Sequence, residues 1–176
     1  LHFGSSPNHF NLIHAETNLC FGGGLDDVWV DPKDGVLYIV DYKSTANLSA
    51  DPKPVSLEGQ WKGAYKRQMD MYQFIMRGKG YEVSNTGYFV YVDGQHLGIN
   101  GMIDKVEPSE AWMLFNTSLL EYAGDDSWVE PALFEIKELL TSGNCPPHSK
   151  NCEQGLFIKE VEEVALSRAQ NTIPMD

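Results

Sequence analysis

Long hydrophobic runs are absent from this sequence, where no stretch approaches the roughly 18 to 20 apolar residues that a membrane-spanning helix requires. The start of the chain also lacks the charged and then apolar pattern of a secretory signal. The sequence begins at Leu1 without an initiator methionine, so we expect an N-terminal segment of the protein to be missing. These absences predict a soluble, cytoplasmic protein with no membrane partner.

Cysteine is scarce, which limits both disulfides and metal sites. The three residues Cys20, Cys145 and Cys152 cannot all pair within one chain. Free thiols in a reducing cytosol are the simplest interpretation. A zinc site built from Cys145, Cys152 and His148 is the alternative, although the two cysteines are spaced widely for a zinc knuckle.

Basic residues are also few, with 13 Lys and Arg against 25 Asp and Glu and a formal net charge of −12. This charge argues against general nucleic-acid binding, because phosphate contacts depend on Lys and Arg. Five of the basic residues nevertheless fall in one short stretch: Lys62, Lys66, Arg67, Arg77 and Lys79. The stretch is either a solvated helix face or a surface for a phosphate backbone.

The residues that are present describe a globular protein with strands and helices in alternation. A chain of 176 residues, 42% of them apolar, is long enough to bury a real core. Hydrophobic patterns and turn signals predict strands over 10–21, 25–30, 36–40 and 88–92. They predict helices over 61–77, 128–140 and in the tail from 157. Residues 111–122 fit either a strand or a helix. The order predicts an α/β (α+β) fold, with helices packed on a mixed central sheet.

Acidic side chains mark two neighbouring predicted strands. Asp26 follows a Gly-Gly-Leu turn, and Asp41-Tyr42-Lys43 ends the strand 36–40. Because strand residues two positions apart point to the same face, Asp41 and Lys43 share a face while Tyr42 points away. Two carboxylates converging from adjacent strands can hold Mg²⁺ or Mn²⁺, and the backbone carbonyl of Tyr42 is a natural further ligand.

This pattern suits hydrolysis of a phosphodiester, although an ion pair is the simpler alternative. A bound cation polarises the ester and lowers the pKa of a bound water, and Lys43 supplies positive charge beside the reacting phosphate. Alone, Asp41 and Lys43 would read as a surface ion pair at a strand end. The helix 61–77 adds Gln68 and Tyr72, which lie four residues apart on one face. The ordered set favours the metal site.

These three motifs together resemble the PD-(D/E)XK nuclease superfamily. The quoted segments are Gly23-Gly24-Leu25-Asp26-Asp27-Val28, Asp41-Tyr42-Lys43 and Gln68-Met69-Asp70-Met71-Tyr72. They look most like the RecB-like branch, which includes nuclease domains of recombination helicases and CRISPR-associated exonucleases. The resemblance covers about residues 10–92 well. It implies a restriction-endonuclease-like fold in a single domain over 1–176.

The resemblance also implies a function and roles for individual residues. Asp26 and Asp41 would be metal ligands, Lys43 the catalytic lysine, and Gln68 and Tyr72 a supporting pair near the DNA backbone. The implied protein is a Mg²⁺- or Mn²⁺-dependent deoxyribonuclease, an exonuclease, in DNA repair, recombination or defence. Its partners would be single-stranded DNA or a duplex end, and a helicase. The basic residues assigned to the DNA backbone are Lys62, Lys66 and Arg67.

The sequence departs from the family pattern in ways that keep alternatives open. Many members carry an upstream helical histidine as a metal ligand. Here the substitute is either His14, with Glu16 on the same strand face, or a residue of the missing N-terminal segment. A partly exposed strand histidine is the alternative for His14. A catalytically silent, DNA-binding or scaffolding module is the alternative function. A metal hydrolase of another phosphoester, using His14 and Glu16, is a third hypothesis.

Two further comparisons with the family concern cysteine and a second acidic motif. Several relatives bind an iron–sulfur cluster through four cysteines. The segment from Cys152 to Gly155 looks like a Cys-x-x-Cys whose second cysteine has become glycine, so we predict no cluster. Gly101-Met102-Ile103-Asp104 repeats the Gly-x-hydrophobic-Asp pattern without a following acid-x-Lys strand, and is interpreted as a decoy. Asp27 is expected on the strand face opposite Asp26.

Overall fold

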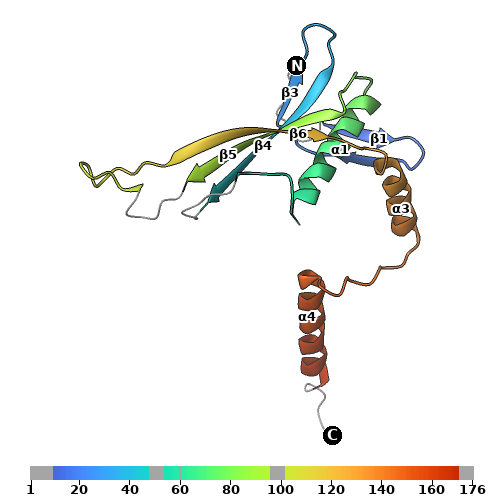
Figure 1. Ribbon diagram of the computed structural model, residues 1–176. Helices are drawn as coiled ribbons and strands as arrows, with labels where there is room; N and C mark the ends of the chain where they lie inside the picture. Colours follow the sequence, from blue (N-terminus) through green and yellow to red (C-terminus); the bar gives the residue numbers. More distant parts are fainter. Residues whose placement is uncertain (1–9, 48–53, 60, 96–101, 171–176) are drawn as a thin grey trace. The chain divides into compact units, whose positions relative to one another are not determined.

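A computed structural model describes residues 10–47, 54–59, 61–95 and 102–170. The predicted fold class is confirmed, because a four-stranded mixed sheet and a two-stranded sheet combine with helices (Figure 1). The chain divides into two compact units, Leu1–Lys137 and Glu138–Asp176, which are described separately below. None of the helices in the described ranges is long and apolar enough to span a membrane.

The four-stranded sheet has the order β3-β4-β5-β6. A tight turn joins β3 (Asp27–Val30) to β4 (Leu37–Asn47) as an antiparallel hairpin. Helix α1 (Lys62–Gly78) then carries the chain across to β5 (Thr86–Gln95), which runs parallel to β4. Such a crossover is the usual way to place consecutive strands in parallel. An antiparallel β6 (Leu114–Ala123) completes the sheet, which resolves the ambiguity over residues 111–122 in favour of a strand.

Residues 10–21, predicted as one strand, instead form a separate hairpin of β1 (Asn11–His14) and β2 (Leu19–Gly22). The turn closes through a 2.8 Å hydrogen bond from the Asn18 N–H to the His14 carbonyl, with Asn18 at a φ of 56°. Asparagine adopts this left-handed conformation more readily than most residues. The prediction was wrong because the short polar turn was read as part of an alternating strand.

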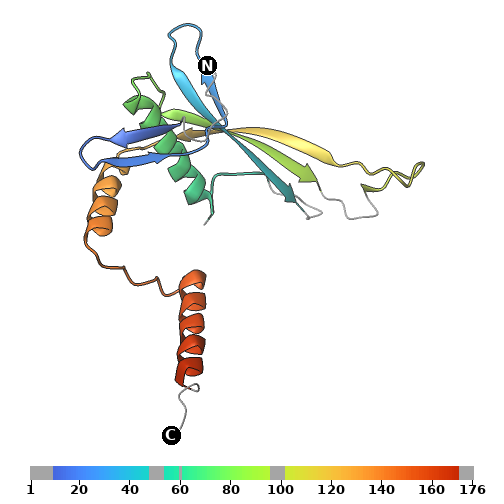
Figure 2. The same cartoon turned by 180° about the vertical axis from the view of Figure 1, so that it is seen from behind.

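Helix α1 packs between this hairpin and the sheet (Figures 1 and 2). One of its sides buries apolar residues against the sheet residues Ile39 and Phe89, both fully buried. Its hairpin side meets Phe10, whose ring lies edge-on to Tyr72 at 5.3 Å. The predicted amphipathic helix over 61–77 is therefore confirmed within one residue, because its apolar spacing matches two surfaces that need covering.

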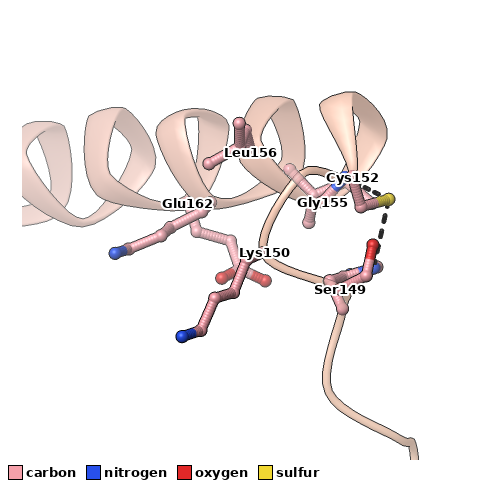
Figure 3. Close-up of a pocket in the computed structure, with 9 residues that line it drawn as sticks. Ser149, Lys150, Cys152, Gly155, Leu156 and Glu162 are labelled. Atoms are coloured by element: carbon pink, nitrogen blue, oxygen red, sulfur yellow. Dashed lines mark hydrogen bonds between the residues drawn. The ribbon is translucent and has the colours of Figure 1, made fainter.

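The two later helices differ in how closely their first residues match the prediction. Helix α3 (Val129–Thr141) matches the predicted 128–140. In the second unit, α4 (Glu153–Gln170) begins before the predicted residue 157, because the Cys152 thiol accepts the Gly155 N–H at 3.3 Å (Figure 3). A Cβ on Gly155 would lie 2.4 Å from the His148 ring. Glycine is thus required there, beside a cavity of about 490 Å³.

Candidate active site

Asp26 lies at the junction between the glycine turn and β3. Its Oδ2 accepts the backbone N–H of Tyr42 at 2.9 Å, which ties the turn to β4. A Cβ added to Gly23 would stand 2.7 Å from the Tyr72 ring, so a side chain would not fit where the turn passes α1. The glycine therefore has a packing reason, and it allows the turn to bring Asp26 beside β4.

Asp41 is the buried acid of the site, with 2% of its surface exposed. Burial raises the pKa of this carboxyl group, opposed by the nearby Lys43 ammonium and reinforced by the negative charge of Asp26. Lys43 Nζ lies 2.5 Å from Asp41 Oδ2. Asp41 Oδ1 has no hydrogen-bond partner among the described residues. A buried carboxylate oxygen without a donor is costly, so this atom marks a position suited to a cation.

The two faces of β4 separate the charged groups as the sequence predicted. Tyr42 lies on the face opposite Asp41 and Lys43, where its hydroxyl donates to Asp27 Oδ2 at 2.7 Å. Asp27 thus supports Tyr42 while Asp26 lies against the backbone of β4. The two adjacent carboxylates thus bind different parts of Tyr42: Asp26 accepts its backbone N–H, and Asp27 accepts its side-chain hydroxyl.

Helix α1 supplies the side chains that contact Lys43. Lys43 Nζ donates to Gln68 Oε1 at 3.3 Å, and Gln68 Nε2 donates to the Tyr72 hydroxyl at 2.7 Å. Lys43 Nζ also lies 4.7 Å from the centre of the Tyr65 ring, within cation–π range. The predicted residues Asp41, Lys43, Gln68 and Tyr72 therefore form one connected chain of polar contacts.

Tyr65 was missed in the sequence, although a signal for it was present. It precedes Gln68 by three positions, so Tyr65, Gln68 and Tyr72 follow the 3–4 spacing of one helix face. Lys62 lies over the same ring at 5.2 Å and donates to the Tyr91 hydroxyl at 2.5 Å. The aromatic residues under these two lysines make the site partly apolar as well as charged.

The predicted basic residues have different surroundings. Arg67 is exposed, and Lys66 forms an exposed ion pair with Glu58 at 3.3 Å. Arg77, by contrast, pairs with Asp126 and donates to carbonyl groups between α1 and β5. Its guanidinium group therefore fixes the helix to the sheet. Lys62, Lys66 and Arg67 remain the predicted DNA contacts.

His14 is buried, which corrects the expectation of a partly exposed strand histidine. Only 6% of its surface is exposed. Its Nε2 faces Glu16 in the β1–β2 turn at 3.1 Å and Glu130 in α3 at 3.5 Å. The expectation that Glu16 lies on the same strand was wrong, since the strand ends at His14. A role for His14 beside Asp26 and Asp41 stays a prediction.

The second Gly-x-hydrophobic-Asp motif ends in a turn. Asp104 Oδ1 accepts the backbone N–H groups of Val106 and Glu107 at 2.7 and 2.9 Å. These hydrogen bonds lower the pKa of the Asp104 carboxyl group. Gly101 lies outside the described residues. The geometry gives Asp104 a local structural role, in keeping with its interpretation as a decoy.

Comparison of the chain with protein-family models, curated proteins and solved structures finds no match. The resemblance to the PD-(D/E)XK nucleases therefore rests on the sequence motifs alone and stays a prediction.

Proposed function

We propose that this protein is a Mg²⁺- or Mn²⁺-dependent deoxyribonuclease of the PD-(D/E)XK type, hydrolysing phosphodiester bonds. One observation carries the proposal: buried Asp41 keeps an oxygen without a donor, beside the acid Asp26 and the cation Lys43. An ordinary surface ion pair would be exposed and would need no second carboxylate. A site for a cation accounts for both features.

The residues fit a hard divalent cation. Such ions prefer oxygen ligands, and Asp41 Oδ1 together with the Asp26 carboxylate supplies them. The Tyr42 carbonyl is the proposed further ligand. When bound, the cation would polarise the phosphodiester and lower the pKa of an attacking water. A cation bound at Asp41 Oδ1 would take the place of the missing hydrogen-bond donor. It would therefore offset part of the free-energy cost of burying this carboxylate.

Lys43 is the proposed catalytic cation. Its ammonium group would stabilise negative charge that develops on the phosphate oxygens. Gln68 and Tyr65 restrict the position of the ammonium group, and Tyr72 in turn holds Gln68. Preorganised charge of this kind does not have to reorient during the reaction, which is why such contacts accelerate hydrolysis.

DNA is the proposed substrate, as a single strand or a duplex end. Lys62, Lys66 and Arg67 lie on the first turns of α1, the helix that also supplies Gln68. Positive charge beside the site would hold the phosphate backbone, while the acidic remainder of the chain would repel it. We propose a role in DNA repair, recombination or defence, with a helicase as partner.

Cleavage assays with Asp41→Ala and Lys43→Ala test this mechanism. With Mg²⁺ or Mn²⁺ and labelled single- or double-stranded DNA, each substitution should lower kcat by at least about 100-fold. Asp27→Asn is the matched control, because this neighbouring carboxylate lies on the other strand face and should leave the rate within about two-fold. Cleavage that survives both site substitutions rules the mechanism out.

A silent DNA-binding or scaffolding module is the second candidate. The net charge of −12 and the pairing of Lys66 with Glu58 favour its scaffolding form, since both weaken attraction for phosphate. Calorimetry with Mn²⁺ separates the candidates. Binding that disappears in Asp41→Asn supports the nuclease, whereas no binding to the wild-type chain supports the scaffold.

A further inference from the structure

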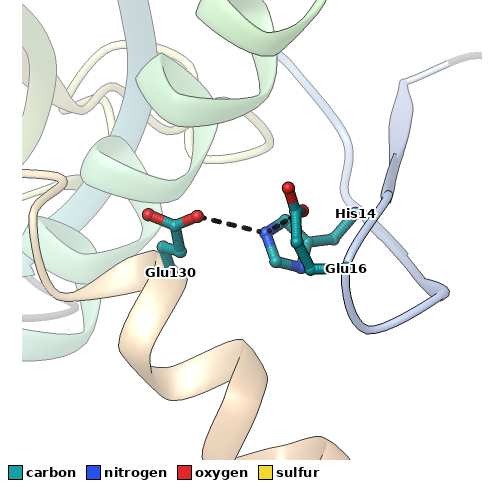
Figure 4. Close-up of side chains that lie close together, drawn as sticks. All are labelled: His14, Glu16 and Glu130. Carbon is teal, nitrogen blue, oxygen red and sulfur yellow. Dashed lines mark hydrogen bonds and ion pairs between the residues drawn. The ribbon is translucent and has the colours of Figure 1, made fainter.

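Three potential metal ligands converge where the β1–β2 hairpin meets α3 (Figure 4). They are His14 at the end of β1, Glu16 in the following turn and Glu130 in the first turn of α3. One ligand atom from each lies within 4.8 Å of the others. In the described part of the chain, no hydrogen bond or ion pair joins them to Asp26, Asp41 or Lys43. They form a cluster separate from the candidate active site.

The histidine is held as a ligand would be. Its Nδ1 lies 3.0 Å from Thr17 Oγ1, and Thr17 is itself buried and accepts the Leu19 N–H. When Nδ1–H donates to this oxygen, the lone pair on Nε2 points at the two glutamates. Metal-binding histidines in proteins are oriented in this way, by a hydrogen bond to the other ring nitrogen. Phe134 closes the side of the ring at 5.5 Å.

The donor spacing matches a small divalent cation. Zinc–nitrogen and zinc–oxygen distances of about 2.0–2.2 Å place neighbouring tetrahedral ligands about 3.3–3.6 Å apart. Nε2 lies 3.5 Å from Glu130, within that range, and 3.1 Å from Glu16, about 0.2 Å below it. The glutamate side chains are more than half exposed, whereas His14 is buried. A cation could therefore enter from solvent and bind against a fixed nitrogen.

From this geometry we propose that His14, Glu16 and Glu130 form a structural site for a zinc-class divalent cation. Water would occupy the remaining position. The cation would fasten the hairpin to α3, joining residues 116 positions apart in the chain. Phe10, the residue just before β1, packs against Tyr72 of α1. The site would thus stabilise the part of the fold that packs against α1. The proposal does not depend on nuclease activity.

Zinc titration of a variant of the full chain tests the proposal. This variant, called the background, lacks side chains that could compete for zinc. The background carries Asp41→Asn and serine at Cys20, Cys145 and Cys152, and the protein is stripped of metal with a chelator. Calorimetry should show one bound zinc. Adding Glu130→Gln should weaken binding at least about ten-fold, because it removes a charged ligand from an exposed position without emptying the core. Zinc should also raise the Tm of the background.

Glu135→Gln is the matched control, since Glu135 is also exposed on α3. It should leave both the affinity for zinc and the rise in Tm unchanged. Equal zinc affinity in the Glu130→Gln and Glu135→Gln proteins would overturn the proposal. So would the absence of zinc binding in the background, which would assign His14 to an ion pair with the two glutamates. Neither result would alter the test of Asp41 and Lys43.

Discussion

The two clusters of charged side chains in the first unit differ in which group is buried. At the candidate active site the buried group is an acid, Asp41, and its Oδ1 lacks a donor. At the hairpin the buried group is His14, which is hydrogen-bonded at Nδ1 and faces exposed acids. A buried carboxylate with an oxygen that lacks a donor lowers the stability of the fold, and a bound ligand can offset this loss. A buried imidazole whose nitrogen is hydrogen-bonded instead contributes to stability. The first arrangement therefore suits chemistry and the second suits structure.

The sharpest way to separate the clusters is to remove charge from one of them. Asp41→Asn should lower cleavage of DNA by at least about 100-fold, because it removes a metal ligand. The same protein should still be stabilised by zinc, because His14, Glu16 and Glu130 are intact. Cleavage rates and thermal melting on one preparation measure both effects. Loss of the zinc effect together with activity would show that the two clusters are one site.

His14→Ala should act on stability. The substitution removes a buried ring together with its contacts to Thr17 and Phe134. We expect a loss of about 1–3 kcal/mol in the free energy of unfolding, measured by urea denaturation in a chelator. Asn18→Ala changes only the residue with a left-handed backbone conformation in the same turn. It should lower the free energy of unfolding by less, about 1 kcal/mol. A smaller effect for His14→Ala than for Asn18→Ala would contradict the structural role.

Tyr72→Phe should have a moderate effect on catalysis. It removes the hydroxyl that accepts the Gln68 amide and keeps the ring that packs on Phe10. Losing one hydrogen bond of about 1 kcal/mol corresponds to a decrease of about five-fold in kcat. Tyr42→Phe removes a comparable hydroxyl on the other strand face and should leave kcat unchanged. Equal effects of the two substitutions would contradict a positioning role for Tyr72.

The smallest effect concerns pH. Burial raises the pKa of Asp41 above its ordinary 3.8, so the folded state retains a proton that the unfolded state has released. Without metal, the Asp41 contribution to the free energy of unfolding should fall as pH rises from 3.8 through the raised pKa. Asp41→Asn should abolish this fall and should be more stable than wild type above that window. Melting curves in a chelator across this pH range measure the difference, and parallel curves would contradict it.

Much of the candidate site was readable from local patterns. The two-residue period of β4 placed Asp41 and Lys43 on one face and Tyr42 on the other, as the structure has them. Helical spacing placed Gln68 and Tyr72 together. The burial of His14 could not be predicted, because its partner Glu130 lies 116 residues away and no local sequence pattern indicates that contact. The same reason hid the pairing of Arg77 with Asp126.

The sequence by itself determined the elements that carry the chemistry: a glycine turn before Asp26, an apolar strand before Asp41, and an amphipathic α1. These depend on periodicity and turn preferences, which act over a few residues. Only the tertiary structure decided which charges became buried and what they faced. In the folded chain Asp41 is buried with its Oδ1 lacking a donor, and His14 faces Glu16 and the distant Glu130. Burial and long-range pairing depend on the whole fold, so local sequence patterns do not contain them.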